Sequence, residues 1–236
     1  MQNVWFLLNI EKNNIDKIFK WVKIEYMKNK YASKNTLKRL PFYIEYLKMI
    51  QKEGEKFVSS TTIAKKLNLN DVQVRKDLAI VSRSGGKPKV GYEIDELLND
   101  FELFLGVDQN NRSVLVGVGS LGRALLNYNG FNEYGLSIVK AFDVKKDLLY
   151  SKINKIEIMP LDTLEDFCKK NEIHIGIITV PHQFAQEVCN KLVKAGVKAI
   201  WNFAPTKLNV DEDILIQNEN MASSLAILCR HLNTKK

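Results

Sequence analysis

A glycine-rich turn, between a run of apolar residues and a helix-like stretch, constrains the fold of this chain more than any other feature. The stretch VLVGVGSLGRALLNY, residues 114 to 128, places Gly117, Gly119 and Gly122 in the spacing G-x-G-x-x-G. In a dinucleotide-binding turn the first glycine allows the tight bend, the second lets the backbone approach a pyrophosphate, and the third lets the helix pack closely on the strand. The sequence therefore predicts a strand, a turn and a helix whose N-terminus faces phosphate groups.

An acidic residue after the next apolar run fits the same motif. Asp143, in AFDVKKD, lies 21 residues after Gly122. A carboxylate at this point accepts hydrogen bonds from the adenosine ribose of NAD and repels the 2′-phosphate of NADP. The neighbouring Lys145 and Lys146 leave NADP open, because their ammonium groups tolerate that phosphate. We predict NAD(H) as the cofactor.

From residue 112 onward, strand-like and helix-like segments alternate. This alternation is typical of an α/β fold with a Rossmann-type, doubly wound parallel sheet. The apolar stretch MASSLAILCRHLN predicts a last helix after the sheet. The predicted strands cover residues 113–118, 137–144, 156–159, 173–180 and 197–203, and the predicted helices cover 122–128, 164–171, 182–196 and 221–233.

Residues 28 to 92 carry the positive charge of the chain. They hold 15 lysines and arginines against 5 aspartates and glutamates, while the net charge of the whole chain is +8. Charge confined to one candidate domain is the expected signature of phosphate binding by a nucleic-acid-binding unit.

Three helices are predicted in this basic part, with a short turn, NLN, between the second and the third. The first carries apolar residues from Leu40 to Ile50 at helical spacing, the second is TTIAKKL, and the third is DVQVRKDLAIVS. A short helix, a tight turn and a helix form the pattern of a helix-turn-helix unit. The candidate N-caps are Asn35 or Thr36, Ser59 or Ser60, and Asn70 or Asp71.

The third helix separates apolar from charged side chains. Val74, Leu78 and Val81 fall on one side, and Lys76 and Arg83 point to the opposite side. In a helix-turn-helix unit such a charged face enters the major groove. The basic ribbon SRSGGKPKVGY that follows is typical of a wing. The candidate DNA contacts are Ser60, Thr61, Gln73, Arg75, Lys76, Lys87 and Lys89.

Other classes of protein are disfavoured by the composition. The sequence contains no run of about 18 apolar residues, so no membrane span is predicted. The first residues, MQNVWFLLNIEKNN, lack the basic leader and cleavage site of a signal peptide, so we expect a cytoplasmic protein. Cys168, Cys189 and Cys229 are too widely spaced for a zinc site or a disulfide framework. We expect no metal.

As a set, the motifs of this chain resemble the Rex family of redox-sensing transcriptional repressors. The resemblance implies a homodimer that binds a DNA operator, senses the NADH/NAD+ ratio and is released from DNA by NADH. It also implies that the C-terminal helix is domain-swapped and that no reaction is catalysed. The matching stretches are RLPFYIEYL (39–47), QVRKDL (73–78), GY (91–92), VGVGSLGRALLNY (116–128), FDV (142–144), TVP (179–181), AGVKAI (195–200) and NFAP (202–205).

The resemblance also predicts domains and cofactor contacts. We expect an N-terminal extension (1–35), a winged-helix domain (36–92), a connection (93–111), a Rossmann domain (112–219) and a swapped helix (220–236). The connection is predicted to contain an amphipathic helix, IDELLNDFELFLG. Residues 1 to 26 are interpreted as an upstream-start artefact, since Met27 lies where family members begin. The implied cofactor contacts are Gly117, Gly119, Ser120, Leu121, Gly122, Tyr128, Asp143, Thr179, Val180, Pro181, Asn202, Phe203 and Ala204.

Two positions depart from the family pattern. Family members carry an arginine at the position of Glu45 and an aspartate at the position of Asn220, a pair that can bridge subunits. Their absence leaves open whether the switch works in the usual way. Two other functions also remain open: an NAD-dependent oxidoreductase with a basic appendage, although a substrate domain is not evident, and a CoA-binding regulator, because TVP and NFAP are similar to CoA-binding domains.

Overall fold

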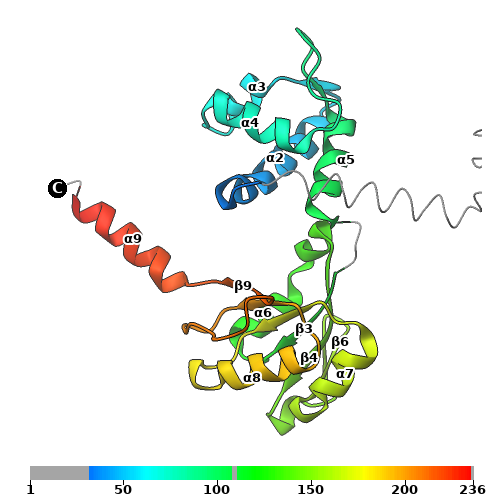
Figure 1. Cartoon of the computed structure of the whole chain (residues 1–236), viewed down its shortest axis with the longest axis vertical. Coiled ribbons are helices and arrows are strands. Elements are labelled where there is room, and N and C mark those ends of the chain that lie inside the picture. Colours follow the sequence, from blue (N-terminus) through cyan, green and yellow to red (C-terminus); the bar gives the residue numbers. More distant parts are fainter. Residues whose placement is uncertain (1–31, 108–110, 235–236) are drawn as a thin grey trace, which may run out of the picture. The chain divides into compact units, whose positions relative to one another are not determined.

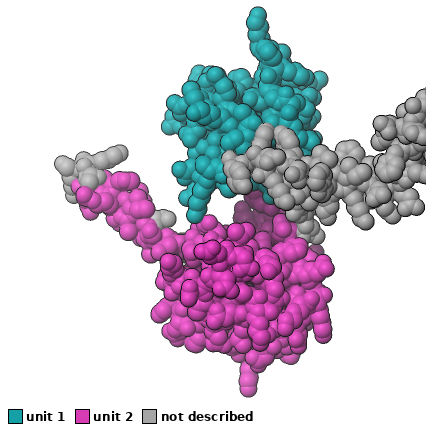
Figure 2. Space-filling model, in the orientation of Figure 1, with its two compact units in different colours: residues 1–106 teal, residues 107–236 magenta. Residues whose placement is uncertain are grey.

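The computed structural model describes residues 32–107 and 111–234, which form two compact units (Figure 2). Unit 1 extends to Gly106 and unit 2 starts at Val107. The interpretation of residues 1 to 26, and most of the expected N-terminal extension, lie outside the described residues. None of the helices in the described ranges is both long and apolar enough to cross a membrane.

Unit 1 is a small helical unit with a two-stranded ribbon (Figure 1). Its core is formed by side chains from four helices, among them Leu40, Ile63, Leu78 and Phe101, all fully buried. Its elements are α2 (Lys34–Lys52), β1 (Phe57–Val58), α3 (Ser60–Lys66), α4 (Asp71–Val81), β2 (Tyr92–Glu93) and α5 (Ile94–Leu105).

The helix-turn-helix prediction is confirmed in its caps for α3 and α4. Ser59 accepts a hydrogen bond from the amide of Thr62, and Asn70 accepts one from the amide of Gln73. The cap predicted for α2 is wrong, because the N-cap is Ser33, two residues before Asn35 and three before Thr36. Thr36 lies inside the helix, where its hydroxyl donates to buried Asp77.

The amphipathic helix expected in IDELLNDFELFLG, within the connection, is confirmed as α5, and α5 is the last helix of unit 1. Ile94, Leu97 and Phe101 of α5 are buried in the unit 1 core.

Arg83 was predicted on the charged face of the third helix, and this prediction is wrong. Arg83 follows the end of α4, and its main-chain amide and side chain both donate to Asp100 of α5.

Unit 2 is a seven-stranded sheet in the order β5-β6-β4-β3-β7-β8-β9. All neighbouring strands are parallel except β5 and β6, so the six parallel strands have the 3-2-1-4-5-6 order of a Rossmann fold. The fold-class prediction is thereby confirmed. The strands are β3 (Asn111–Val116), β4 (Leu136–Asp143), β5 (Lys152–Ile153), β6 (Ile156–Pro160), β7 (Ile175–Ile178), β8 (Ala199–Asn202) and β9 (Leu215–Asn218).

Helices cover both faces of this sheet. The side chains of α7 and α8 pack in one core cluster, and those of α6 pack in another on the opposite face. The last helix, α9, exposes Leu225, Ile227, Leu228 and Leu232, each more than half accessible. The helices are α6 (Ser120–Asn127), α7 (Leu164–Asn171), α8 (His182–Lys194) and α9 (Met221–Thr234), and short 3-10 turns are η2 (Asn129–Tyr134), η3 (Lys146–Leu148) and η4 (Leu161–Thr163).

Candidate functional site

The glycine-rich turn links the carboxyl end of β3 to the start of α6. Gly117 has a φ of +100°, and a Cβ there would lie 2.8 Å from Val180 Cγ1. A Cβ on Gly122 would collide with the carbonyl oxygen of Gly117. A Cβ on Gly119, in contrast, would meet nothing within 4 Å. Gly117 and Gly122 are therefore needed for folding, whereas Gly119 faces open space that a ligand can occupy.

The N-terminus of α6 faces that space without a competing side chain. Gly119 is the N-cap residue, and α6 has no side-chain cap hydrogen bond. Ser120 is exposed and Leu121 is half-buried in the first turn. Uncapped amides and the positive end of the helix dipole favour an anion at this point.

Asp143, at the end of β4, is joined to the turn by main-chain amides. Its Oδ2 accepts from the amide of Val118 at 2.6 Å, and its Oδ1 accepts from the amide of Lys145 at 2.9 Å. Each carboxylate oxygen has a further lone pair with which it can accept a ligand hydroxyl. The structure thus brings the predicted acidic residue beside the predicted turn.

The TVP segment follows β7, the strand next to β3, and contacts the glycine-rich turn at Gly117. The hydroxyl of Thr179 lies 2.6 Å from the carbonyl oxygen of Gly117, to which it donates, and 3.1 Å from that of Val116. Val180 is half-buried and Pro181 is exposed at the start of α8. Thr179 therefore shapes the site through the backbone of the turn.

Asn202, at the end of β8, is fully buried and holds the NFAP loop. Its Oδ1 accepts from the amide of Ala204 at 3.0 Å, and its Nδ2 donates to Thr206 O at 3.0 Å and to Asn218 Oδ1 at 2.9 Å. These bonds use the polar atoms of the side chain within the protein. Phe203 is half-buried and Pro205 is exposed, so these side chains of the loop remain accessible to a ligand.

Tyr128 lies at the opposite end of α6 from the glycine-rich turn and is 58% exposed. Its ring contacts Phe131, and a chain of ring contacts continues through Trp201 to Phe203, with centroid separations of 4.8, 5.5 and 4.7 Å. The structure therefore connects Tyr128 to the NFAP loop by aromatic packing and does not place it beside the turn.

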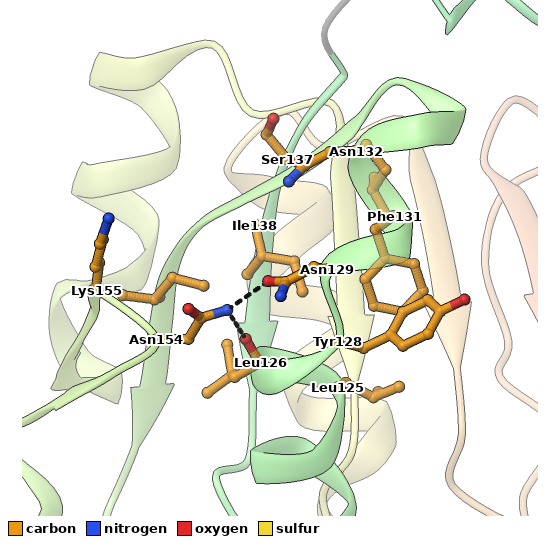
Figure 3. Close-up of a pocket in the computed structure, with 12 residues that line it drawn as sticks. Leu125, Leu126, Tyr128, Asn129, Phe131, Asn132, Ser137, Ile138, Asn154 and Lys155 are labelled. Atoms are coloured by element: carbon orange, nitrogen blue, oxygen red, sulfur yellow. Dashed lines mark hydrogen bonds between the residues drawn. The ribbon is translucent and has the colours of Figure 1, made fainter.

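A separate cavity of about 300 Å³ lies next to Tyr128 (Figure 3). Asn154, in the turn between β5 and β6, donates to Leu126 O and to Asn129 Oδ1. It thereby satisfies a carbonyl in the last turn of α6. This cavity contains none of the glycine-turn residues.

On unit 1, three predicted DNA contacts meet at one carboxylate. Asp71, the first residue of α4, accepts hydrogen bonds from the hydroxyls of Ser60 and Thr61 at 3.2 and 3.1 Å. Arg75 pairs with Asp71 at 2.7 Å, and the side chains are 63% and 35% exposed. This exposed pair is easily rearranged, since such pairs are worth at most about 1 kcal/mol.

A buried polar cluster that the sequence analysis missed joins α2 to α4. Asp77 accepts from Arg39, Tyr43 and Thr36, at distances of 2.8 to 3.0 Å. Burial alone raises the pKa of Asp77, but the hydrogen bonds from Arg39, Tyr43 and Thr36 outweigh it and hold that pKa below its ordinary value. Burial, followed by the contact with Asp77, raises the pKa of Tyr43 to about 12. One sequence signal existed: Asp77 lies on the apolar stripe of α4.

The predicted wing is a tight hairpin. Lys87 and Gly91 exchange main-chain hydrogen bonds of 2.8 and 2.9 Å, and Lys89 has a φ of +64° at the tip. Gly91 packs so closely on Val58 that a Cβ there would collide with the Val58 carbonyl. Lys76, Lys87 and Lys89 are all exposed.

Comparison with known families finds one match within each unit. Residues 32–79 match the family described as putative DNA-binding protein N-terminus. Residues 108–206 match the family described as CoA binding domain.

Curated relatives match most of the chain. The redox-sensing transcriptional repressor Rex of Bacteroides thetaiotaomicron is 44% identical, and the match covers 84% of this chain and 90% of that protein. The protein of the same name from Treponema denticola is 40% identical, with 89% and 99% covered.

Solved structures are similar over the same length. RSP in complex with β-NAD+ and operator DNA is 35% identical, with a TM-score of 0.82 and coverage of 87% of this chain and 94% of that one. RSP in complex with β-NADH is 36% identical, with a TM-score of 0.76 and coverage of 86% and 95%.

Proposed function

The chain belongs to the Rex family of redox-sensing transcriptional repressors, and from this we propose that it represses transcription by binding an operator that NADH releases. One observation carries the proposal. A basic helix-turn-helix unit and a Rossmann unit, whose glycine-rich turn is bonded to Asp143, occur in a single chain. The nucleotide is a signal in this function, and no hydride needs to be transferred.

NAD(H) fits the residues around the turn. The pyrophosphate would lie over Gly119, which has no side chain, and would accept from the uncapped amides of Ser120 and Leu121. Asp143 would accept the adenosine ribose hydroxyls. The nicotinamide, which is charged in NAD+ and neutral in NADH, would lie near Val180, Pro181 and Phe203. Thr179, Asn202 and Ala204 would act by positioning these segments.

A homodimer would connect the cofactor to DNA. The four exposed leucine and isoleucine side chains of α9 would be buried by exchange of this helix between subunits. A two-fold dimer presents two recognition helices at the spacing of a palindromic operator. NADH would favour the state in which that spacing is lost, because a ligand shifts an equilibrium towards the state it binds more tightly.

For the DNA contacts we propose α4 in the major groove and the wing on the phosphates. Gln73, Arg75 and Lys76 would read or contact the groove from α4. Ser60 and Thr61 would contact the backbone from α3, and Lys87 and Lys89 from the wing. A repressor of this kind works where the chromosome is, so we propose a cytoplasmic location.

CoA is a second candidate ligand, because residues 108–206 match the CoA binding domain family. Difference binding with NADH, NAD+, NADPH and CoA separates the candidates. We expect NADH to bind most tightly and CoA to leave DNA binding unchanged. Release of DNA by CoA but not by NADH would reassign the signal.

The decisive experiment is a gel-shift titration on the promoter region of the chain's own gene, at one fixed salt concentration. Wild type should bind specifically, and saturating NADH should weaken binding more than NAD+ does. The Arg75→Ala/Lys76→Ala variant should lose DNA affinity and keep NADH affinity. Unchanged operator binding by this variant would contradict the assignment of α4 as the recognition helix.

A further inference from the structure

The recognition helix contains a glutamine whose amide is held by an arginine from another helix. From this contact we propose that Arg39 makes Gln73 a hydrogen-bond donor only, so that Gln73 recognises an acceptor on one base and cannot read adenine through a paired contact. This inference rests on the proposed function, because it concerns how α4 reads the operator.

Arg39 is anchored before it meets Gln73. Its Nε donates to Asp77 Oδ2 at 2.8 Å and its Nη2 to Asp77 Oδ1 at 2.9 Å, with side-chain exposures of 16% for Arg39 and 3% for Asp77. Asp77 is itself held by Tyr43 and Thr36. A planar guanidinium paired along one side with a buried carboxylate has a fixed orientation.

The end of that guanidinium faces the side-chain amide of Gln73. With the amide oxygen turned towards Arg39, Oε1 accepts from Nη1 at 3.1 Å and from Nη2 at 3.0 Å. The reverse orientation would place the NH2 group of Gln73 against a group that can only donate. Hydrogen-bond chemistry therefore selects the first orientation, in which the oxygen is occupied by Arg39.

Gln73 remains exposed although its oxygen is held. It lies in the first turn of α4, the part of a recognition helix that contacts base edges. Arg75, two residues further along α4, differs from it, since Arg75 is exposed and its partner Asp71 is only half-buried, so that the pair can separate. The orientation of Gln73 is thus set from inside the protein.

This orientation changes what Gln73 can read. A glutamine that recognises adenine accepts from N6 with its oxygen and donates to N7 with its nitrogen. With its oxygen bound to Arg39, Gln73 has only the NH2 group to offer. Its targets in the major groove are then the acceptors: N7 of a purine, O6 of guanine or O4 of thymine.

The first test selects preferred duplexes from a random pool with wild type and with Gln73→Ala. The position whose preference disappears in Gln73→Ala is the base that Gln73 reads. At that position, analogues lacking the acceptor, such as a 7-deazapurine, should weaken wild-type binding roughly fivefold, as expected for one hydrogen bond. An adenine analogue without the N6 amino group should bind within about twofold of adenine, because no bond to N6 is made.

Two variants test the role of Arg39 and of the nitrogen. Gln73→Glu keeps an oxygen for Arg39 but has no N–H, so it should lose the preference at that position as Gln73→Ala does. Arg39→Lys keeps the charge beside Asp77 but has no planar fork for Gln73. Its selectivity should change at the Gln73 position alone, with adenine there becoming sensitive to loss of N6 by roughly fivefold. A merely structural role of Arg39 would lower affinity at all positions together.

The outcomes separate this inference from the function on which it rests. Failure of wild type to select any site overturns the proposed function and the inference with it. A selected site without a position that depends on Gln73 overturns the inference alone. Equal losses on removal of N6 and N7 in wild type, or a preference retained by Gln73→Glu, also overturn it.

Discussion

The main-chain amide of Val118 donates a 2.6 Å hydrogen bond to Oδ2 of Asp143. The residue proposed to bind the adenosine ribose therefore also holds the glycine-rich turn against the end of β4. Because one carboxylate serves both purposes, loss of Asp143 should affect the phosphate-binding turn as well as the ribose.

Replacement of Asp143 by alanine should weaken NADH binding roughly tenfold or more, because charge-assisted hydrogen bonds to ligand and turn are lost together. The preference for NADH over NADPH should shrink, since repulsion of the 2′-phosphate is removed. Isothermal titration calorimetry measures both. Asp147→Asn, which removes an equal charge from an exposed residue four positions away, is the control. A wild type that prefers NADPH would contradict the role of Asp143.

Gly119→Ala should weaken nucleotide binding without unfolding the protein. A Cβ at this position meets no protein atom, so the thermal midpoint should stay near that of wild type. The added methyl group would occupy the space proposed for the pyrophosphate, and NADH affinity should fall by roughly tenfold or more, about 1.4 kcal/mol. Gly122→Ala is the contrasting variant, because its Cβ would collide with the Gly117 carbonyl and destabilise unit 2. Unchanged NADH affinity in Gly119→Ala would place the phosphates elsewhere.

Asp77→Asn should destabilise unit 1 by about 3 kcal/mol, because an amide cannot accept from all the buried donors around it. The pKa of Asp77 is lowered from its ordinary value of 3.8. The folded state therefore binds fewer protons, and the stability from Asp77 is present above that value and is lost as the pH falls through the folded pKa.

Amide hydrogen exchange in α2 and α4 between neutral and acidic pH measures this effect. Wild type should lose protection as the pH falls below about 3.8, and Asp77→Asn should lack this part of the acid sensitivity. Glu102→Gln, an exposed site in α5, controls for net charge. Identical acid profiles for wild type and Asp77→Asn would show that the cluster does not govern acid stability.

The two buried thiols should be inert in the folded chain. Burial raises the pKa of Cys168 to about 11 and also raises that of Cys189. In a Cys229→Ala variant, a thiol reagent such as dithionitrobenzoate at mildly alkaline pH should react with neither cysteine until denaturant is added, because the thiolate is the reactive form. Rapid reaction of the native variant would contradict the burial of both residues.

The effect of NADH on operator affinity should be smaller in this chain than in relatives that carry an arginine and an aspartate at the positions of Glu45 and Asn220. Asn220 accepts a hydrogen bond from the amide of Ser223 at the start of α9. An aspartate in its place keeps this cap. Operator affinity should be measured with and without NADH in wild type and in Glu45→Arg/Asn220→Asp. The ratio of the affinity without NADH to the affinity with NADH should be larger in the double variant than in wild type. If the double variant behaves as wild type, this pair has no part in switching.

Much of the architecture follows from sequence because its signals are local. The G-x-G-x-x-G spacing and the alternation of strands and helices predicted the Rossmann sheet, and the caps of α3 and α4 follow from Ser59 and Asn70. Glycine conformations, caps and apolar periodicity depend on residues close in the chain, so the sequence alone carries them. The short strand β9 was missed, because LIQN has little apolar periodicity and forms by pairing with β8.

The tertiary structure decided what the polar side chains do. By sequence, Asp77 is a charged residue of a DNA-binding helix, and the family resemblance implied that Asn202 is a cofactor contact. Folding buries both among hydrogen-bond donors and acceptors. Arg39 and Gln73 lie 34 residues apart, and their contact exists only after α2 packs on α4. A buried polar group must find partners wherever the chain brings them, so its role depends on packing between distant segments, which no local pattern contains.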